Sequence, residues 1–197
     1  IGEEIRLQVA AMLADVDPRV RQAAALLTAN LADAAALEAL LKRLEVEDTA
    51  SVRQALLTGL GQLRDPKALP AILKEVRSAD PDVSAAAAAA LARIATRRPI
   101  EGPQRAEAVE ALVARYEATQ ATGNGVALRE ALLTAMGAVG DKAFQPALRT
   151  ALGDPAAVVR LAGVNALAAL GDASAGPVLA RLTEDPDRGV RQAALSA

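Results

Sequence analysis

The feature of this sequence that most constrains its fold is an aliphatic-arginine pair that returns at nearly regular intervals. Five pairs follow the pattern and a sixth departs from it: Val20-Arg21, Val52-Arg53, Leu128-Arg129, Val159-Arg160 and Val190-Arg191, with Val83-Ser84 as the departure. Successive pairs lie 32, 31, 45, 31 and 31 residues apart. Such a period is the signature of a repeat protein rather than of one globular core.

Further residues recur at fixed distances from these pairs. Twelve residues after the second member of each of the first five pairs, four repeats have an aspartate: Asp33, Asp65, Asp141 and Asp172. The remaining repeat has Thr96 at this place. Asp-Pro steps precede four of the pairs, at Asp17-Pro18, Asp80-Pro81, Asp154-Pro155 and Asp185-Pro186. Because Asp favours the N-cap and Pro the first helical position, we expect a helix to begin at each of these steps.

Helical spacing follows each start. In the second repeat the apolar positions are Val52, Ala55, Leu56, Gly59, Leu60 and Leu63, which form one broad stripe on a helix. Gly-Asp steps at Gly140-Asp141 and Gly171-Asp172 are typical of one helix ending and the next being capped. Each repeat is therefore predicted to be two antiparallel helices, which we name its first and second helix.

These columns resemble the HEAT repeat family, in its short form found in phycobilisome-lyase-type HEAT-like repeats. The resemblance rests on Asp154-Pro155, Val159-Arg160, Ala166-Leu167, Leu170-Gly171-Asp172 and Pro177, and it recurs over nearly the whole chain. It implies an all-α, right-handed α-solenoid of six two-helix repeats. Their approximate bounds are 1–31, 32–63, 64–97, 98–140, 141–171 and 172–197, within a single domain.

Two roles are open for the arginine column, Arg21, Arg53, Arg129, Arg160 and Arg191. These side chains could form a basic stripe for anionic ligands. The HEAT resemblance instead implies that each arginine pairs with an acid at the turn before its helix, as part of a structural ladder between repeats. Acids stand six residues upstream at Asp15, Glu47, Asp154 and Asp185, and Ser84 predicts a weaker ladder around the third and fourth repeats.

The second helices of such solenoids line a concave groove. Counting from the aliphatic residue of each pair, positions two, six and nine are expected to point away from the core. The candidate partner-binding residues at these positions are Gln22, Gln54, Thr58, Glu130, Thr134, Asn165 and Gln192. This small, mildly polar surface would suit an extended segment or a helix of a partner protein, although such residues can also be merely solvated.

The 45-residue step contains about fourteen additional residues. We expect them to form two lengthened turns, at 97–103 and 121–125, that project from the stack. Arg93, Arg97 and Arg98 lie at the first of these turns and are candidate contacts for an acidic partner. The alternative is that these cations cap the carboxyl end of a helix, where positive charge is favourable.

Enzyme chemistry is poorly supported by the composition. The chain has no His and no Cys, so the usual general base, the thiol nucleophile and the best transition-metal ligands are missing. Tyr116 and Phe144 are single aromatic residues that we expect to be packed between helices. We therefore expect no catalytic site, no metal and no cofactor.

The sequence favours a non-catalytic scaffold that binds another protein or a peptide segment. The formal net charge is -2 with both signs interspersed, which argues against nucleic acid, and no apolar run is long enough for a membrane. Two alternatives remain: a domain associated with a chromophore (bilin) lyase, as the family resemblance implies, and a nucleic-acid-binding solenoid. The ends look like cuts within a longer protein, and the Ala- and Arg-rich composition suggests a bacterial source.

Overall fold

Paired helices make up the whole of the described structure. The computed structural model describes residues 3–31, 34–122, 125–171 and 175–197, and no strand occurs in these ranges. The chain divides into two compact units, residues 1–98 and 99–197. The predicted all-α fold of HEAT-like two-helix repeats is confirmed, while the prediction of one domain with the stated repeat bounds stays a prediction.

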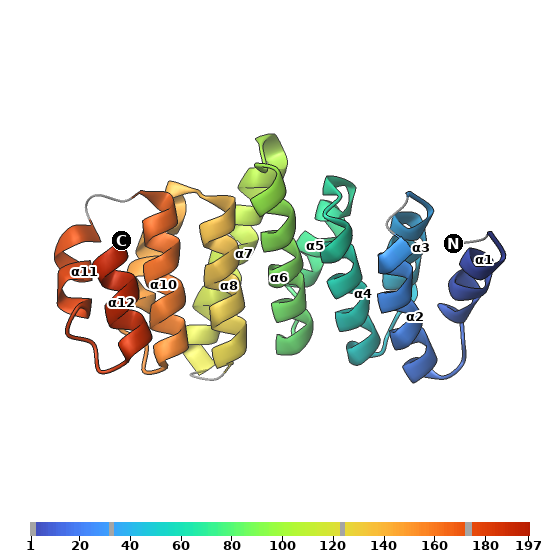
Figure 1. Ribbon diagram of the computed structural model, residues 1–197, viewed down its shortest axis with the longest axis horizontal. Coiled ribbons are helices and arrows are strands. Elements are labelled where there is room, and N and C mark those ends of the chain that lie inside the picture. The colour runs from blue at the N-terminus through green and yellow to red at the C-terminus, as the bar shows by residue number, and fades with distance from the viewer. Residues whose placement is uncertain (1–2, 32–33, 123–124, 172–174) are drawn as a thin grey trace. The chain divides into compact units, whose positions relative to one another are not determined.

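In residues 1–98 the second helices form one layer and the first helices pack behind them (Figure 1). The second helices α2, α4 and α6 span Pro18–Leu31, Ala50–Leu63 and Pro81–Arg97. The first helices α1, α3 and α5 span Glu3–Met12, Ala34–Val46 and Leu69–Val76, and a 3-10 turn, η1, at Pro66–Ala68 leads into α5. The predicted stripe on α4 is buried from Val52 to Leu60, as the helical period requires.

Residues 99–197 repeat the same arrangement (Figure 1). The second helices α8, α10 and α12 span Val126–Val139, Ala157–Leu170 and Arg188–Ser196. The first helices α7, α9 and α11 span Gly102–Thr122, Gln145–Ala151 and Gly176–Leu182, with a 3-10 turn, η2, at Lys142–Phe144. Tyr116 and Phe144 are buried, as expected, with 1% and 0% of their surfaces exposed.

Two of the four Asp-Pro steps do not begin a helix. Helices α2 and α6 start at Pro18 and Pro81 as predicted, with Asp80 accepting the amides of the first turn of α6. Helix α10 instead starts at Ala157 and α12 at Arg188. The aspartates of the other two steps lie earlier in their turns, where Asp154 accepts the Ala156 amide at 2.9 Å and Asp185 accepts the Asp187 amide at 2.8 Å.

The additional residues of the 45-residue step mainly lengthen a helix. A turn at residues 98–101 connects α6 to α7 within the predicted range 97–103, whereas residues 121 and 122 of the predicted second turn are helical. Helix α7 has 21 residues, whereas the first helices α9 and α11 have 7 each. Residues 104–122 contain neither Gly nor Pro, so nothing interrupts the helix once it has begun. Gly123 and Asn124 of the predicted second turn lie outside the described residues, as do Asp33 and Asp172 of the aspartate column.

Candidate functional site

Buried ion pairs connect consecutive repeats within each unit. The Arg21 Nε and Nη2 atoms donate to the Glu47 carboxylate, each at 2.9 Å, across the α2–α4 step. In the other unit, Arg129 donates from Nε and Nη2 to Asp154 at 2.8 and 3.2 Å, and Arg160 donates to Asp185 at 2.8 and 2.7 Å. Two parallel hydrogen bonds of this kind fix both distance and angle, so each pair sets how one repeat stacks on the next.

The acid partners of Arg21, Arg129 and Arg160 therefore lie in the following repeat, not six residues upstream as expected. What lies six residues upstream is a main-chain acceptor: Arg21 Nη1 donates to the Asp15 carbonyl oxygen at 2.9 Å, and Arg160 Nη1 to that of Asp154 at 2.9 Å. Arg191 contacts the Asp185 carbonyl oxygen in the same way, at 2.7 Å. One guanidinium thus joins the turn before its own helix to the turn of the next repeat.

The third repeat keeps this connection with different residues. Arg53 pairs with Glu75, near the end of α5, and its Nη1 atom donates to the Glu47 carbonyl oxygen at 2.8 Å. Ser84, which stands in the arginine column, is fully buried and its hydroxyl donates to the Val76 carbonyl oxygen at 2.6 Å. A short side chain therefore satisfies the carbonyl oxygen of the turn beside it.

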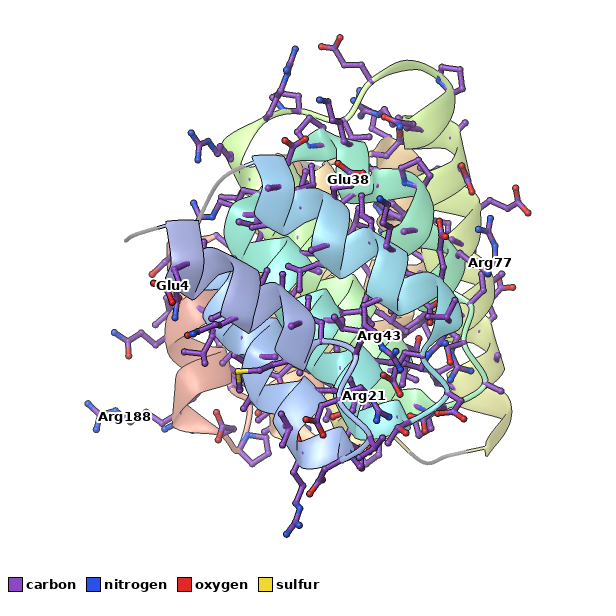
Figure 2. All side chains as sticks on the ribbon, turned by 90° about the vertical axis from the view of Figure 1, so that its right-hand side faces the viewer. Glu4, Arg21, Glu38, Arg43, Arg77 and Arg188 are labelled. Carbon is purple, nitrogen blue, oxygen red and sulfur yellow. The ribbon has the colours of Figure 1, made fainter. Side chains whose placement is uncertain are left out.

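The Glu47 carboxylate accepts hydrogen bonds from three residues. Burial alone would raise the pKa of its carboxyl, but hydrogen bonds from Arg21, the Thr49 amide and Arg43 outweigh that effect and lower the pKa from 4.5 to about 2. Figure 2 shows the Arg21 and Arg43 side chains close together, with Glu38 nearer the other end of α3. Hydrogen bonding to Arg160 likewise lowers the pKa of Asp185.

The candidate partner-binding residues lie on the outer side of the second helices. Gln22 is exposed, and Gln54 and Thr58 are half-buried in unit 1, residues 1–98. The four candidates of unit 2, residues 99–197, are all exposed: Glu130, Thr134, Asn165 and Gln192. We call these two sets the polar stripe of unit 1 and the polar stripe of unit 2.

At position nine the sequence-based prediction of an outward-facing residue is wrong in the first three repeats, whereas Gly137 is half-buried and Ala168 of the fifth repeat is exposed. Ala29 and Ala92 are 4% and 7% exposed, and Gly61 is buried. A Cβ added to Gly61 would lie 2.8 Å from the Cα of Ala90, and one added to Gly137 would lie 3.0 Å from the Cα of Ala166. Neighbouring second helices approach so closely at position nine that no larger side chain fits, and the outer surface is correspondingly narrower.

The Thr hydroxyls of the stripes are already engaged within their own helices. Thr58 donates to the Gln54 carbonyl oxygen and Thr134 to that of Glu130, both at 2.9 Å. These hydroxyl oxygens can still accept a hydrogen bond, but their protons are used. The amides of Gln22, Gln54, Asn165 and Gln192 therefore carry most of the donor capacity of the two stripes.

A second candidate surface was not fully visible in the sequence. The carboxyl ends of α4 and α6 border a cavity of about 570 Å³ lined by Gln62, Leu63, Arg64, Asp65, Pro66, Arg97 and Arg98, which we name the Arg64 cavity. It includes two of the predicted insertion arginines, and Arg93 lies one turn before Arg97 on α6. Arg64 was not predicted as a site residue. It stands where two other repeats have glycine, at Gly140 and Gly171, and this difference was the available signal.

Arg64 has an unusual backbone conformation. Its φ is 52°, and among the described residues it is the non-glycine residue with positive φ. The glycines at the same helix end in unit 2, Gly140 and Gly171, have φ of 68° and 62°. A side chain in the left-handed region costs roughly 1–2 kcal/mol, so Arg64 occupies a position where glycine would be more stable.

No group of acids, His or Cys in the described part of the chain is arranged to hold a metal ion. Burial raises the pKa of Tyr116 to about 12, so its hydroxyl stays protonated at neutral pH. None of the described helices has the length and apolar character needed to cross a membrane.

Comparison with known proteins places the chain in a family. The HEAT repeats family matches residues 37–123 and 122–197, and the chain belongs to this family. The resemblance first seen in the arginine and Gly-Asp columns is thereby confirmed. No match was found among curated proteins.

Several solved structures share the fold. The complex of CpcE and CpcF of phycocyanin lyase from Nostoc sp. PCC7120 is similar with a TM-score of 0.72 and 26% identity, over 96% of this chain and 74% of that chain. An archaeal HEAT-like repeats protein from Thermococcus onnurineus NA1 gives a TM-score of 0.62 and 15% identity, over 96% and 77% of the two chains. An engineered protein gives 0.64 and 19%, over 98% and 94%.

Proposed function

We propose that this chain is a non-catalytic protein-binding scaffold whose polar stripes contact an extended segment or a helix of a partner. The observation that carries the proposal is the row of mostly uncharged donors and acceptors, exposed or half-buried, on the second helices of each unit, with helix contacts as close as that of Gly61 with Ala90. A rigid row of amides pays little entropy on binding, which favours recognition of a partner backbone.

The stripes are tested by charge substitutions with matched controls. Gln54→Lys in unit 1 and Glu130→Lys in unit 2 place a cation on the outer side of a second helix. Gln8→Lys and Glu117→Lys make the same charge changes at exposed positions of the first helices α1 and α7. All four side chains are at the surface or half-buried, so we expect melting temperatures close to that of the parent chain.

Binding is measured by capturing partner proteins from cells that express the chain naturally. We expect a captured protein to be lost or weakened at least about tenfold with Gln54→Lys or Glu130→Lys, because an unpaired cation would be desolvated at the contact. The two control variants should retain it. Undiminished capture by both stripe variants would remove the proposal.

A second candidate function is supported by one comparison. The CpcE and CpcF complex, at 26% identity, belongs to a phycocyanin lyase and contains two proteins. A role of this chain beside a chromophore lyase, with a second HEAT-like chain as partner, is therefore the alternative. Adding a linear tetrapyrrole should then change its absorbance spectrum, and an unchanged spectrum would count against this alternative.

A further inference from the structure

The Arg64 cavity concentrates positive charge that the described residues do not fully neutralise. Arg64, Arg97 and Arg98 line it together with a single acid, Asp65. No side-chain hydrogen bond or ion pair to Arg64, Arg93, Arg97 or Arg98 exists among the described residues. The arginines of the ladder, by contrast, are paired with buried carboxylates in the same structure.

The corresponding turn of unit 2 is closed by the chain itself. There Arg105 of α7 donates to the Asp141 carboxylate at 2.7 Å and to the Gly140 carbonyl oxygen at 2.9 Å. In unit 1 the equivalent acid, Asp65, accepts the Lys67 amide at 2.9 Å and has no guanidinium partner in the described structure. Among the described residues, a guanidinium thus contacts this helix end in unit 2 and none contacts it in unit 1.

Helix capping accounts for only part of this arrangement. A cation in the last turn of a helix is favourable, which explains Arg97 at the end of α6. It does not explain why Arg64 keeps a left-handed backbone where unit 2 has glycine. A strained residue that lines a cavity points to a ligand contact rather than to stability.

We propose that the Arg64 cavity binds carboxylate groups of an acidic segment in a partner protein. This inference rests on the proposed protein-binding function, but it uses a site distinct from the polar stripes. The cavity volume of about 570 Å³ is that of a typical ligand site and can take several side chains. Guanidinium groups match carboxylates through paired N–H donors.

The charge balance favours carboxylates over phosphate. Three arginines and one aspartate leave two positive charges, and two helix carboxyl ends remove roughly one of them, which leaves a net of about +1. A carboxylate carries one negative charge, whereas a phosphate group carries ~1.5 to 2.

The backbone amides at the cavity also favour carboxylates over phosphate as its ligands. Phosphate sites usually provide free amides, but the Arg64 and Arg98 amides here already donate to the Leu60 and Ile94 carbonyl oxygens. Helix carboxyl ends present acceptors, which repel a dianion more strongly than a monoanion. The cavity therefore suits side-chain carboxylates presented one at a time along a peptide.

Fluorescence anisotropy with a labelled octapeptide of alternating Glu and Gly tests the inference, with the Gln-Gly peptide as the neutral control. We expect the whole chain to bind the acidic peptide, and the Arg97→Gln/Arg98→Gln double variant to bind it at least about tenfold more weakly. Arg181→Gln/Arg188→Gln makes the same charge change at two exposed arginines of unit 2 and should bind as the parent does. Equal binding by both double variants would overturn the site.

Arg64→Gly separates binding from stability. Glycine relieves the left-handed backbone, so the melting temperature should rise, while peptide affinity should fall because a guanidinium is lost. A merely structural Arg64 would leave peptide affinity unchanged, and that result would remove Arg64 from the site. Displacement of the peptide by inorganic phosphate at lower concentration than by acetate would overturn the carboxylate assignment.

The Gln54→Lys variant keeps this inference distinguishable from the proposed function. It should bind the acidic peptide as the parent does, because Gln54 does not line the cavity. If the acidic peptide fails to bind while Gln54→Lys still abolishes partner capture, the cavity inference falls and the polar-stripe proposal stands. If the acidic peptide binds while Gln54→Lys still captures the partner, the polar-stripe proposal falls and the cavity inference stands.

Discussion

Single residues set the spacing of the second helices. Gly61 and Gly137 allow the backbones of neighbouring helices to approach, and their column also contains Ala29 and Ala92, which are nearly fully buried. An aromatic content of 1% agrees with this, because close helix approach leaves no room for large side chains. Small residues therefore occupy position nine of the second helices, where the helical period alone predicts a side chain that faces solvent.

Gly61→Ala tests this close approach. Its Cβ would lie 2.8 Å from the Ala90 backbone, so the helices must separate, and we expect a loss of about 1–3 kcal/mol in the free energy of unfolding. Gly176→Ala is the control, since no heavy atom lies within 4 Å of its added Cβ. Urea denaturation measures both; a Gly61→Ala protein as stable as its parent would refute the packing argument.

Neighbouring helices are held together by buried ion pairs as well as by apolar packing. Arg129 and Asp154 are 3% and 8% exposed and join α8 to the turn before α10. The desolvation of both groups is compensated only while both are present. Such a pair contributes more to the angle between repeats than to the net free energy of folding.

Removing one member of this pair should have a large effect. Asp154→Asn removes the buried carboxylate to which Arg129 Nε and Nη2 donate, and we expect a loss of about 3 kcal/mol in the free energy of unfolding together with faster amide hydrogen exchange in α8 and α10. Glu38→Gln, which breaks the exposed pair with Lys42, should cause no measurable change. A small effect of Asp154→Asn would mean that the guanidinium finds water or another acceptor.

At the scale of the whole molecule, the titration of the ladder acids determines how stability depends on pH. The chain has no His, so no side chain of ordinary pKa titrates near neutrality. A carboxyl whose pKa is lowered in the folded state stabilises the protein above its unfolded pKa, and this stabilisation is lost as pH falls toward the folded pKa. For Glu47 these limits are 4.5 and about 2.

We therefore expect the melting temperature to change little between about pH 7 and pH 5 and to fall steeply below about pH 4.5. The lowered pKa values of Asp185 and Asp141 act in the same direction. Glu47→Gln should lower the melting temperature at neutral pH and flatten the acid limb, whereas Glu38→Gln should leave both nearly unchanged. A maximum of stability near pH 3 would contradict the ladder argument.

The class of fold and the existence of the repeats could be predicted from the residues alone. Helical period, glycine at helix ends and the arginine column are local or strictly periodic signals, so they survive without knowledge of distant contacts. The sequence also placed the polar residues of the stripes at positions that the structure finds exposed or half-buried.

Which side chains meet across repeats could not be predicted in this way and becomes apparent in the folded chain. The pairing of Arg21 with Glu47 and of Arg129 with Asp154 spans 26 and 25 residues, and the burial of Gly61 depends on where α6 lies. The Arg64 cavity likewise brings together Arg64 and Arg97, which lie 33 residues apart in the sequence, at the carboxyl ends of α4 and α6. Contacts between repeats depend on stacking distance and angle, which the side chains of both neighbours set together, and no single repeat encodes them.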